Sequence, residues 1–223
     1  MSDVVSLPSE LARLWAATFV LIEAPWADVW TLTQALWANA SRDGWLAWRE
    51  LPCRLDPEAV DRYAGRVQAG VLGPAASGSN ASTLRTSQAD GAASYLAKLA
   101  QRLRCRVVST TFCDDWDRDD AVAALVVLDG RSTYVERWVR VMRNDNGRLE
   151  YIDKGPVQEF EDVQAYAQRA LKDRLSTEVL QACWRRLGLD LPAELDTSSP
   201  RRGIAFVHAN RTPVVGESVL LPA

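Results

Sequence analysis

The chain has 223 residues, of which 48% are apolar and 25% charged, and its formal net charge is −3. These values are typical of a folded globular protein with one large domain or a main body and a smaller part. The small negative charge excludes a global electrostatic attraction to nucleic acid or to anionic membranes. The apolar stretch 14–22 lacks a preceding basic segment and is too short to cross a bilayer. We therefore expect a cytoplasmic protein without a membrane partner.

The first fifty residues contain six of the nine tryptophans, and their spacing is helical. Two stripes follow this spacing, one through Leu11, Trp15, Thr18 and Ile22 and the other through Trp26, Trp30, Thr33 and Trp37. Pro25 stands at the expected first position of the second helix, and Trp45 and Trp48 add a further pair. Such stripes are typical of a core or a helix–helix interface. The number of tryptophans favours an additional contact surface.

A further helix is predicted to begin at Asp56, a good N-cap, and to end near Gly70. Residues 73–90 are small and polar with almost no apolar side chain, which is typical of a flexible loop or linker. A helix is predicted from about Gly91 to Leu103, with Leu96 and Leu99 on its inward face. Because the polar segment begins at residue 73, the helical N-terminal region should span residues 1–72.

The middle of the chain is rich in predicted strands. They cover residues 106–112, 121–128, 133–143 and 148–153. Because short polar turns leave no room for crossover helices, we expect a four-stranded antiparallel meander.

Asn146 and Gly147 indicate a tight two-residue hairpin between the last two strands, because both residues accept positive φ. The register that follows pairs Asp145 with Arg148, Arg143 with Glu150, and Arg140 with Asp153. All three pairs join opposite charges, which would support this alignment.

Two packed helices should follow the sheet. The first carries Phe160, Val163, Tyr166, Ala167 and Leu171, and the second carries Leu180, Cys183, Trp184 and Leu187. Ser176 is the predicted cap of the second helix, and Gly188 ends it. The sequence thus predicts an α+β fold, with an α+β domain at 91–190 and a linker with a short C-terminal hairpin or tail at 191–223.

The sharpest chemical feature is an acidic segment with a single aromatic residue. It consists of Asp114, Asp115, Trp116, Asp117, Asp119 and Asp120. Like charges packed this tightly must lie in water or face cations. Asp115, Asp117 and Asp119 have the first ligand spacings of an EF-hand calcium loop, but the glycine and the final glutamate that such a loop needs are missing. We expect no metal site. We interpret the segment as a contact for a basic partner protein, with a solvated turn as the alternative.

Other catalytic patterns are missing or incomplete. Four scattered cysteines form no zinc motif and are expected to be buried thiols, and His208 is the only histidine. No phosphate-binding loop or dinucleotide fingerprint is present, so no cofactor is expected. Asp129 and Glu136 are available near the sheet for a magnesium-dependent phosphodiesterase, but no Lys follows at the required spacing.

Arginines offer an alternative, in which the protein contacts nucleic acid. The candidates are Arg102, Arg104, Arg106, Arg137 and Arg143. They lie on a predicted helix end and on the strands, without the aromatic pattern of an RNA-binding sheet.

The function favoured by the sequence is non-catalytic protein binding, as an inhibitor, an immunity-type protein or an accessory subunit of a bacterial complex. The first alternative is a nucleic-acid-contacting subunit of a nucleoprotein complex, and the second is a metal-dependent phosphodiesterase. The oligomeric state is left open.

Overall fold

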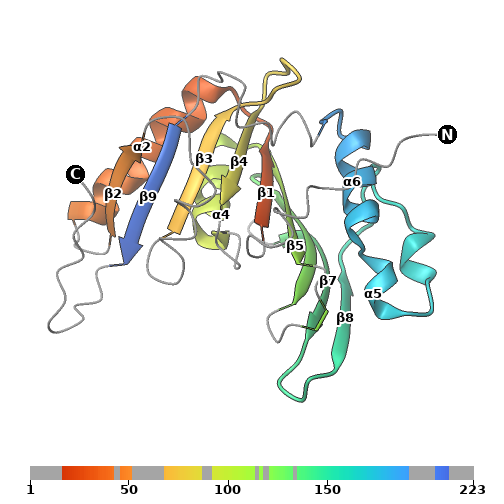
Figure 1. The fold of residues 1–223 in the computed structure, drawn as a ribbon. Helices are drawn as coiled ribbons and strands as arrows, with labels where there is room; N and C mark the ends of the chain where they lie inside the picture. Colours follow the sequence, from red (N-terminus) through yellow and green to blue (C-terminus); the bar gives the residue numbers. More distant parts are fainter. Residues whose placement is uncertain are drawn as a thin grey trace, which may run out of the picture.

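In the described residues, nine strands form one antiparallel sheet (Figure 1). The computed structural model describes residues 17–42, 46–51, 68–86, 92–113, 116–117, 121–132, 135–190 and 204–210. The strand order is β2-β9-β3-β4-β1-β5-β6-β7-β8, and all neighbouring pairs are antiparallel. The sheet therefore joins strands from the beginning, the middle and the late part of the chain.

The strands are β1 (Ala17–Ile22), β2 (Leu46–Leu51), β3 (Gln68–Pro74), β4 (Ser82–Thr86), β5 (Arg106–Cys113), β6 (Val122–Asp129), β7 (Val135–Arg143), β8 (Leu149–Lys154) and β9 (Ile204–Asn210). The helical segments are α2 (Trp26–Arg42), α4 (Ala93–Leu103), the 3-10 turn η1 (Ala165–Ala167), α5 (Leu171–Arg174) and α6 (Thr177–Arg186). The coarse prediction of an α+β fold with an antiparallel sheet is confirmed.

Helices cover the two faces of the sheet at different places. On β1, Val20 and Ile22 belong to the core that α2 and α4 share with the sheet. Phe19 and Leu21 belong to the core on the opposite face, where Leu180 and Trp184 of α6 pack. Figure 1 shows α5 and α6 beside β7 and β8, far from α2. Alternating side chains of the same strand thus enter two separate cores.

The tryptophan stripe of α2 packs on the core that α2 shares with α4: Trp37 is buried, and Trp26 and Trp30 are partly buried. Trp26 stacks on Trp30 with ring centroids 5.8 Å apart, and Trp37 stacks on Tyr95 of α4 at 6.0 Å. The hydroxyl groups of Thr33 and Tyr95 are 2.6 Å apart. The predicted helix is confirmed, and its stripe fixes α2 to α4.

The helical prediction for the first stripe is wrong over residues 17–22, which form β1. Its earlier part, with Leu11 and Trp15, lies outside the described residues. Strand β1 is covered on both faces, so its apolar residues are continuous and do not alternate with polar ones. Residues 46–51, which include Trp48, are likewise a strand. The helix predicted from Asp56 falls mostly on residues 52–67, outside the described residues, and Gly70 lies in β3.

The predicted flexible linker at 73–90 is wrong in its centre. Residues 82–86 form β4, which pairs with β3 on one side and β1 on the other. Ser82, Leu84 and Thr86 are buried, and the Ser82 hydroxyl donates to the Ala24 carbonyl at 3.0 Å. Serine and threonine are buried here because strand pairing and hydrogen bonds to residues distant in the chain satisfy their polar groups.

The four-stranded meander is confirmed as β5–β8, although it is only part of the sheet. Its last hairpin differs from the predicted register by one residue, since Arg143 pairs with Leu149 and Arg140 with Ile152. The Asn144 side chain accepts hydrogen bonds from the backbone N–H groups of Asn146 and Arg148, both at 3.0 Å. Within this loop only Gly147 takes positive φ, at 72°. The loop therefore has three residues, 145–147, instead of the predicted two.

The helix α6 is confirmed, with Ser176 accepting a hydrogen bond from the Val179 N–H. The longer helix predicted before it is wrong, because residues 155–170 form a loop with the short turn η1. Phe160 is buried in this loop, but Val163 is 55% exposed. The prediction of two packed helices therefore holds only for α6 and the four-residue α5.

The C-terminal region contributes β9 to the sheet. This strand lies between β2 and β3 and pairs with both. The predicted hairpin with residues 214–221 and the linker at 191–203 lie outside the described residues.

Cys105 and Cys183 are buried free thiols. Burial raises the pKa of Cys105 and of Cys183 to about 11. Both thiols therefore stay protonated near neutral pH, which suits a structural role.

Candidate functional site

The strands β6, β7 and β8 have one face under α6 and a partly exposed opposite face, on which Val122 and Ala124 of β6 are themselves buried. Val139 and Val141 of β7 are fully buried on the α6 side. The opposite side carries half-buried residues, which we call the Trp138 face: Val126, Trp138, Arg140, Met142 and Ile152. Exposed faces of antiparallel sheets are usually polar, whereas this one is mainly apolar and aromatic.

Arg140 lies at the centre of the Trp138 face, opposite Ala124 on β6 and Ile152 on β8. Its Nε atom is buried and has no hydrogen-bond partner in the described part of the chain. Burial lowers the pKa of Arg140. A guanidinium among apolar neighbours is unfavourable unless it is paired, so a carboxylate placed here from outside would be stabilising.

Trp116, within the acidic segment, lies at one end of this face. Trp116 and Met142 both pack against Ala121, Val122 and Ala124. Arg143 holds Trp116 in place, because its Nη2 donates to the Trp116 carbonyl. Asp117 is exposed, and Asp114, Asp115, Asp119 and Asp120 lie outside the described residues.

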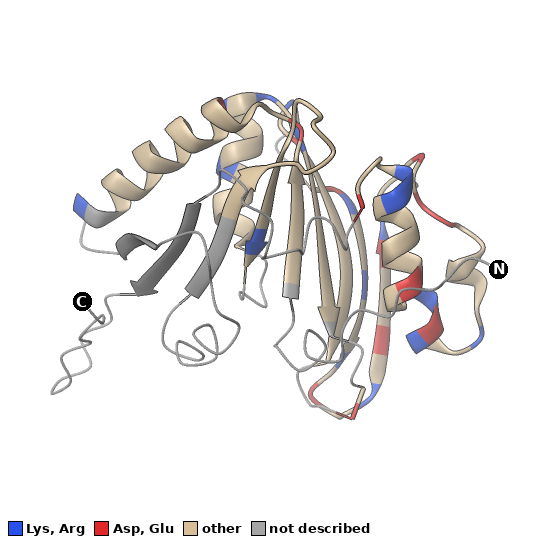
Figure 2. Cartoon of the chain, turned by 45° about the horizontal axis from the view of Figure 1, so that its top comes forward, with Lys and Arg blue, Asp and Glu red and all other residues tan. Residues whose placement is uncertain are grey.

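Charged residues are distributed unevenly over the molecule. Figure 2 shows them on α5 and α6, on the strands beside these helices and on the turns at the strand ends, while the strands in the middle of the picture carry few. Lys154 lies over the Trp138 ring, with its Nζ 5.7 Å from the ring centroid, at the border of the Trp138 face. The apolar strip is thus bordered by charges, as is typical of protein interfaces.

The five arginines predicted to contact nucleic acid do not form one surface. Arg106 is bound between Glu23 and Glu159, each at 2.7 Å. Arg143 is engaged with the Trp116 and Gly147 carbonyls. Arg102 and Arg104 are exposed near the end of α4.

Arg137 requires a correction, because its side chain is wholly buried and is not placed to contact a phosphate. It binds Glu161, also wholly buried, at 2.9 Å and Asp153 at 2.5 Å. Tyr166 Oη donates to Glu161 at 2.6 Å, and the Gln158 N–H donates at 2.7 Å. Burial lowers the pKa of Arg137, but hydrogen bonds to the two carboxylates outweigh this and raise it. The network fixes the loop 155–170 on the sheet.

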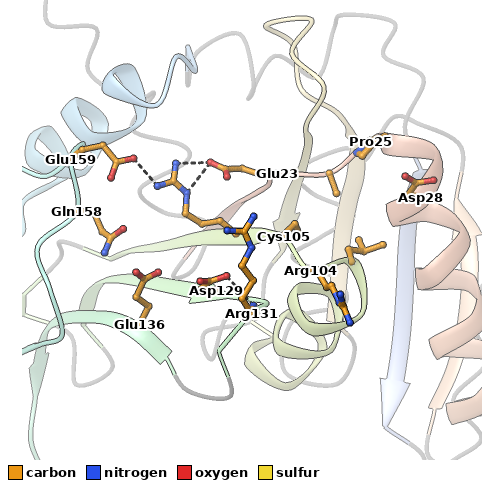
Figure 3. Close-up of a pocket in the computed structure, with 13 residues that line it drawn as sticks. Glu23, Pro25, Asp28, Arg104, Cys105, Asp129, Arg131, Glu136, Gln158 and Glu159 are labelled. Atoms are coloured by element: carbon orange, nitrogen blue, oxygen red, sulfur yellow. Dashed lines mark hydrogen bonds and ion pairs between the residues drawn. The ribbon is translucent and has the colours of Figure 1, made fainter.

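A polar pocket of about 570 Å³ lies at the ends of β5, β6 and β7 (Figure 3). Its walls include Cys105, Asp129, Arg131, Glu136 and Gln158. The sequence did not indicate this pocket, although it noted Asp129 and Glu136, because its walls come from distant segments. The local sequence signal that could have pointed to this pocket is the turn that follows Asp129.

Gly130 positions one wall of this pocket. A Cβ atom at residue 130 would lie 1.8 Å from the Ala100 carbonyl oxygen. The Gly130 N–H also donates to the Cys105 carbonyl at 3.0 Å. Only glycine allows the turn to pack directly on the end of α4, which brings Asp129 and Arg131 to the pocket.

In the described residues, no group of three His, Cys, Asp or Glu side chains converges in a way that could hold a metal ion. Asp129 and Glu136 line the same pocket, but they do not complete such a set.

No helix within the described ranges is both long and apolar enough to span a membrane. Comparison of the chain with protein-family models, curated proteins and solved structures gives no match, so its own residues carry the functional argument.

Proposed function

We propose that this chain is a non-catalytic protein-binding protein, an inhibitor, immunity-type protein or accessory subunit, that docks a partner on the Trp138 face. The observation that carries the proposal is the Arg140 guanidinium, whose buried Nε has no hydrogen-bond partner in the described part of the chain, on a half-exposed apolar face. Burying this face would remove apolar area from water, and a partner carboxylate would satisfy the guanidinium.

The residue types of the face support this function. Tryptophan, methionine and arginine are enriched in protein interfaces, and tryptophan and arginine dominate binding hot spots. The adjoining acidic segment would attract a basic region of the partner and guide its approach. A nucleic-acid function has less support, because Arg106, Arg137 and Arg143 are engaged within the protein.

Replacing Ile152 by aspartate should abolish partner association, because it buries a carboxylate in the apolar part of the face. Trp138→Ala should weaken binding by at least about 30-fold, as loss of an aromatic hot spot does. Val163→Asp is the matched control, because Val163 is exposed on the loop beside α6. The measurement is quantitative affinity capture from a lysate, followed by titration of the purified partner.

Comparing Ile152→Asp with Val163→Asp shows whether the partner docks on the Trp138 face. Loss of one partner with Ile152→Asp, but not with Val163→Asp, supports docking on the Trp138 face. Equal capture of every protein by both variants would contradict it. Circular dichroism and thermal unfolding of each variant must match the wild-type protein.

The acidic segment gives a second prediction about the same partner. Replacing Asp115, Asp117 and Asp119 by asparagine should leave the protein equally stable or slightly more stable, because these carboxylates repel one another. Association should slow and lose much of its salt dependence. Trp116→Ala should instead mainly accelerate dissociation. Binding kinetics at several salt concentrations measure both effects, and an unchanged association rate in the triple variant would remove the segment from the mechanism.

A further inference from the structure

We infer that the pocket at the ends of β5, β6 and β7 binds a basic amino-acid residue with a free carboxylate. Its cationic group would lie against Asp129, Glu136 and Gln158, and its carboxylate would face Arg131. This site is separate from the Trp138 face and does not depend on the function proposed for that face.

The inner part of the pocket offers hydrogen-bond acceptors. Gln158 is 9% exposed, and its Nε2 donates to the Pro156 carbonyl at 3.1 Å, which leaves its side-chain oxygen as an acceptor. Glu136 and Asp129 are half-buried, and Figure 3 shows both with Gln158 on one side of the pocket. Carboxylate and amide oxygens grouped in this way select an ammonium or guanidinium donor.

Two other carboxylates of the pocket are held in ion pairs by one arginine. Glu23 and Glu159 share Arg106, which donates to each at 2.7 Å. The hydrogen bond to Glu23 is the main cause that raises the pKa of Arg106, and Arg106 in turn lowers the pKa of Glu159. Asp28, Asp129 and Glu136 are the lining carboxylates that Arg106 does not bind, and of these Asp129 and Glu136 lie beside Gln158.

The mouth of the pocket carries the opposite charge. Arg131 is exposed beside Asp129, whose Oδ1 accepts from the Arg131 N–H at 3.0 Å. The described residues provide no ion-pair partner for the Arg131 guanidinium. It can therefore bind a carboxylate of the ligand in the bidentate manner usual for arginine.

Arg104 gives independent support for ligand binding at the mouth of the pocket. It ends α4 with φ at 52°, and its N–H donates to the Ala100 carbonyl. Glycine is favoured at such a position, because a side chain is strained at positive φ. Strained residues of this kind cluster at binding sites, and Arg104 lines the same pocket.

Size and charge together limit the ligand. A volume of about 570 Å³ suits a small molecule or one side chain of a polypeptide. The carboxylates would repel a phosphate-rich ligand, and an apolar ligand would leave the charged walls unpaired. A free basic amino acid and a C-terminal arginine or lysine of a polypeptide share the chemistry that fits.

Calorimetric titration with four probes tests the inference and separates these two sources. The probes are L-arginine, agmatine, which lacks the carboxylate, and the peptide Gly-Gly-Arg with a free or an amidated C-terminus. L-Arginine should bind saturably, and agmatine should bind about tenfold more weakly because the charged contact with Arg131 is lost. Tighter binding of the free-acid peptide than of L-arginine assigns the site to polypeptide termini, and the reverse assigns it to free amino acids.

Variants decide whether binding occurs in this pocket. Glu136→Gln should weaken both L-arginine and agmatine by about tenfold or more. Arg131→Gln should weaken L-arginine to the level of agmatine and leave agmatine unchanged. Asp173→Asn, on α5 outside the pocket, is the control and should change neither. No saturable binding of any probe at millimolar concentration, or equal binding by wild type and Glu136→Gln, would overturn the inference.

Discussion

Replacement of Arg137 by methionine is expected to lower the free energy of unfolding by about 3–5 kcal/mol, because it leaves the buried Glu161 carboxylate without its cation. Both side chains are completely buried and 2.9 Å apart. The same change removes the donor to the Gly155 carbonyl, at 2.9 Å, and frees the loop 155–170 from the sheet. Denaturant unfolding followed by circular dichroism gives the difference.

A double variant shows whether the lost charge pairing is the cause. Combining Arg137→Met with Glu161→Leu should recover part of the stability, since apolar residues can replace a buried ion pair without leaving a lone charge. Tyr166→Phe is a smaller perturbation that removes one hydrogen bond to Glu161 and should cost about 1–3 kcal/mol. A loss below about 1 kcal/mol in Arg137→Met would contradict the assigned importance of the pair.

Trp184→Ala should destabilise the protein by about 3–5 kcal/mol, as expected when a large buried side chain leaves a cavity. Trp184 is 2% exposed and joins α6 to the core over β5–β8. Its Nε1 also donates to Thr110 Oγ1 at 2.8 Å, and that group would lose its partner. Thermal and denaturant unfolding measure the change.

The control is Trp184→Phe, which retains a ring but removes the donor, and it should cost less than the alanine change. Trp138→Ala offers the opposite comparison, because Trp138 is half-exposed on the other side of the sheet. If Trp138→Ala destabilised the protein as much as Trp184→Ala, the half-exposed face would be part of the core rather than a surface.

The sequence predicted the elements whose signals are local. The strands β5–β8 follow short apolar runs separated by turns, and α6 has both a serine cap and a terminal glycine. The hairpin register was missed because it depends on the Asn144 side chain, which binds two backbone N–H groups across the loop. That choice between a two-residue and a three-residue loop is not encoded in the Asn-Gly pair itself.

The other errors arise from tertiary context. The apolar run of β1 resembles a helix because helices cover both faces of the sheet there. The serine- and threonine-rich β4 resembles a linker because its polar groups are satisfied by neighbours distant in the chain, as Ser82 is by Ala24. Composition alone cannot reveal such partners.

The Trp138 face could not be identified from the sequence for a related reason. Along β7, Trp138, Val139, Arg140, Val141 and Met142 place bulky or apolar side chains on both sides of the strand. Which side remains half-exposed is decided by α6, which covers Val139 and Val141. The acidic segment was visible in the sequence, but its attachment through Trp116 and Arg143 was not.

The position of β9 has a consequence for the order in which the protein folds during synthesis. The described strand partner of β2 is β9, which the ribosome makes after all the other strands. The meander β5–β8, with its short connections, can form while the chain is still growing. Until β9 is made, one edge of β3 stays unpaired. Unpaired strand edges can associate with other chains. A nascent chain stopped before residue 204 would therefore carry a finished meander beside an incomplete N-terminal half.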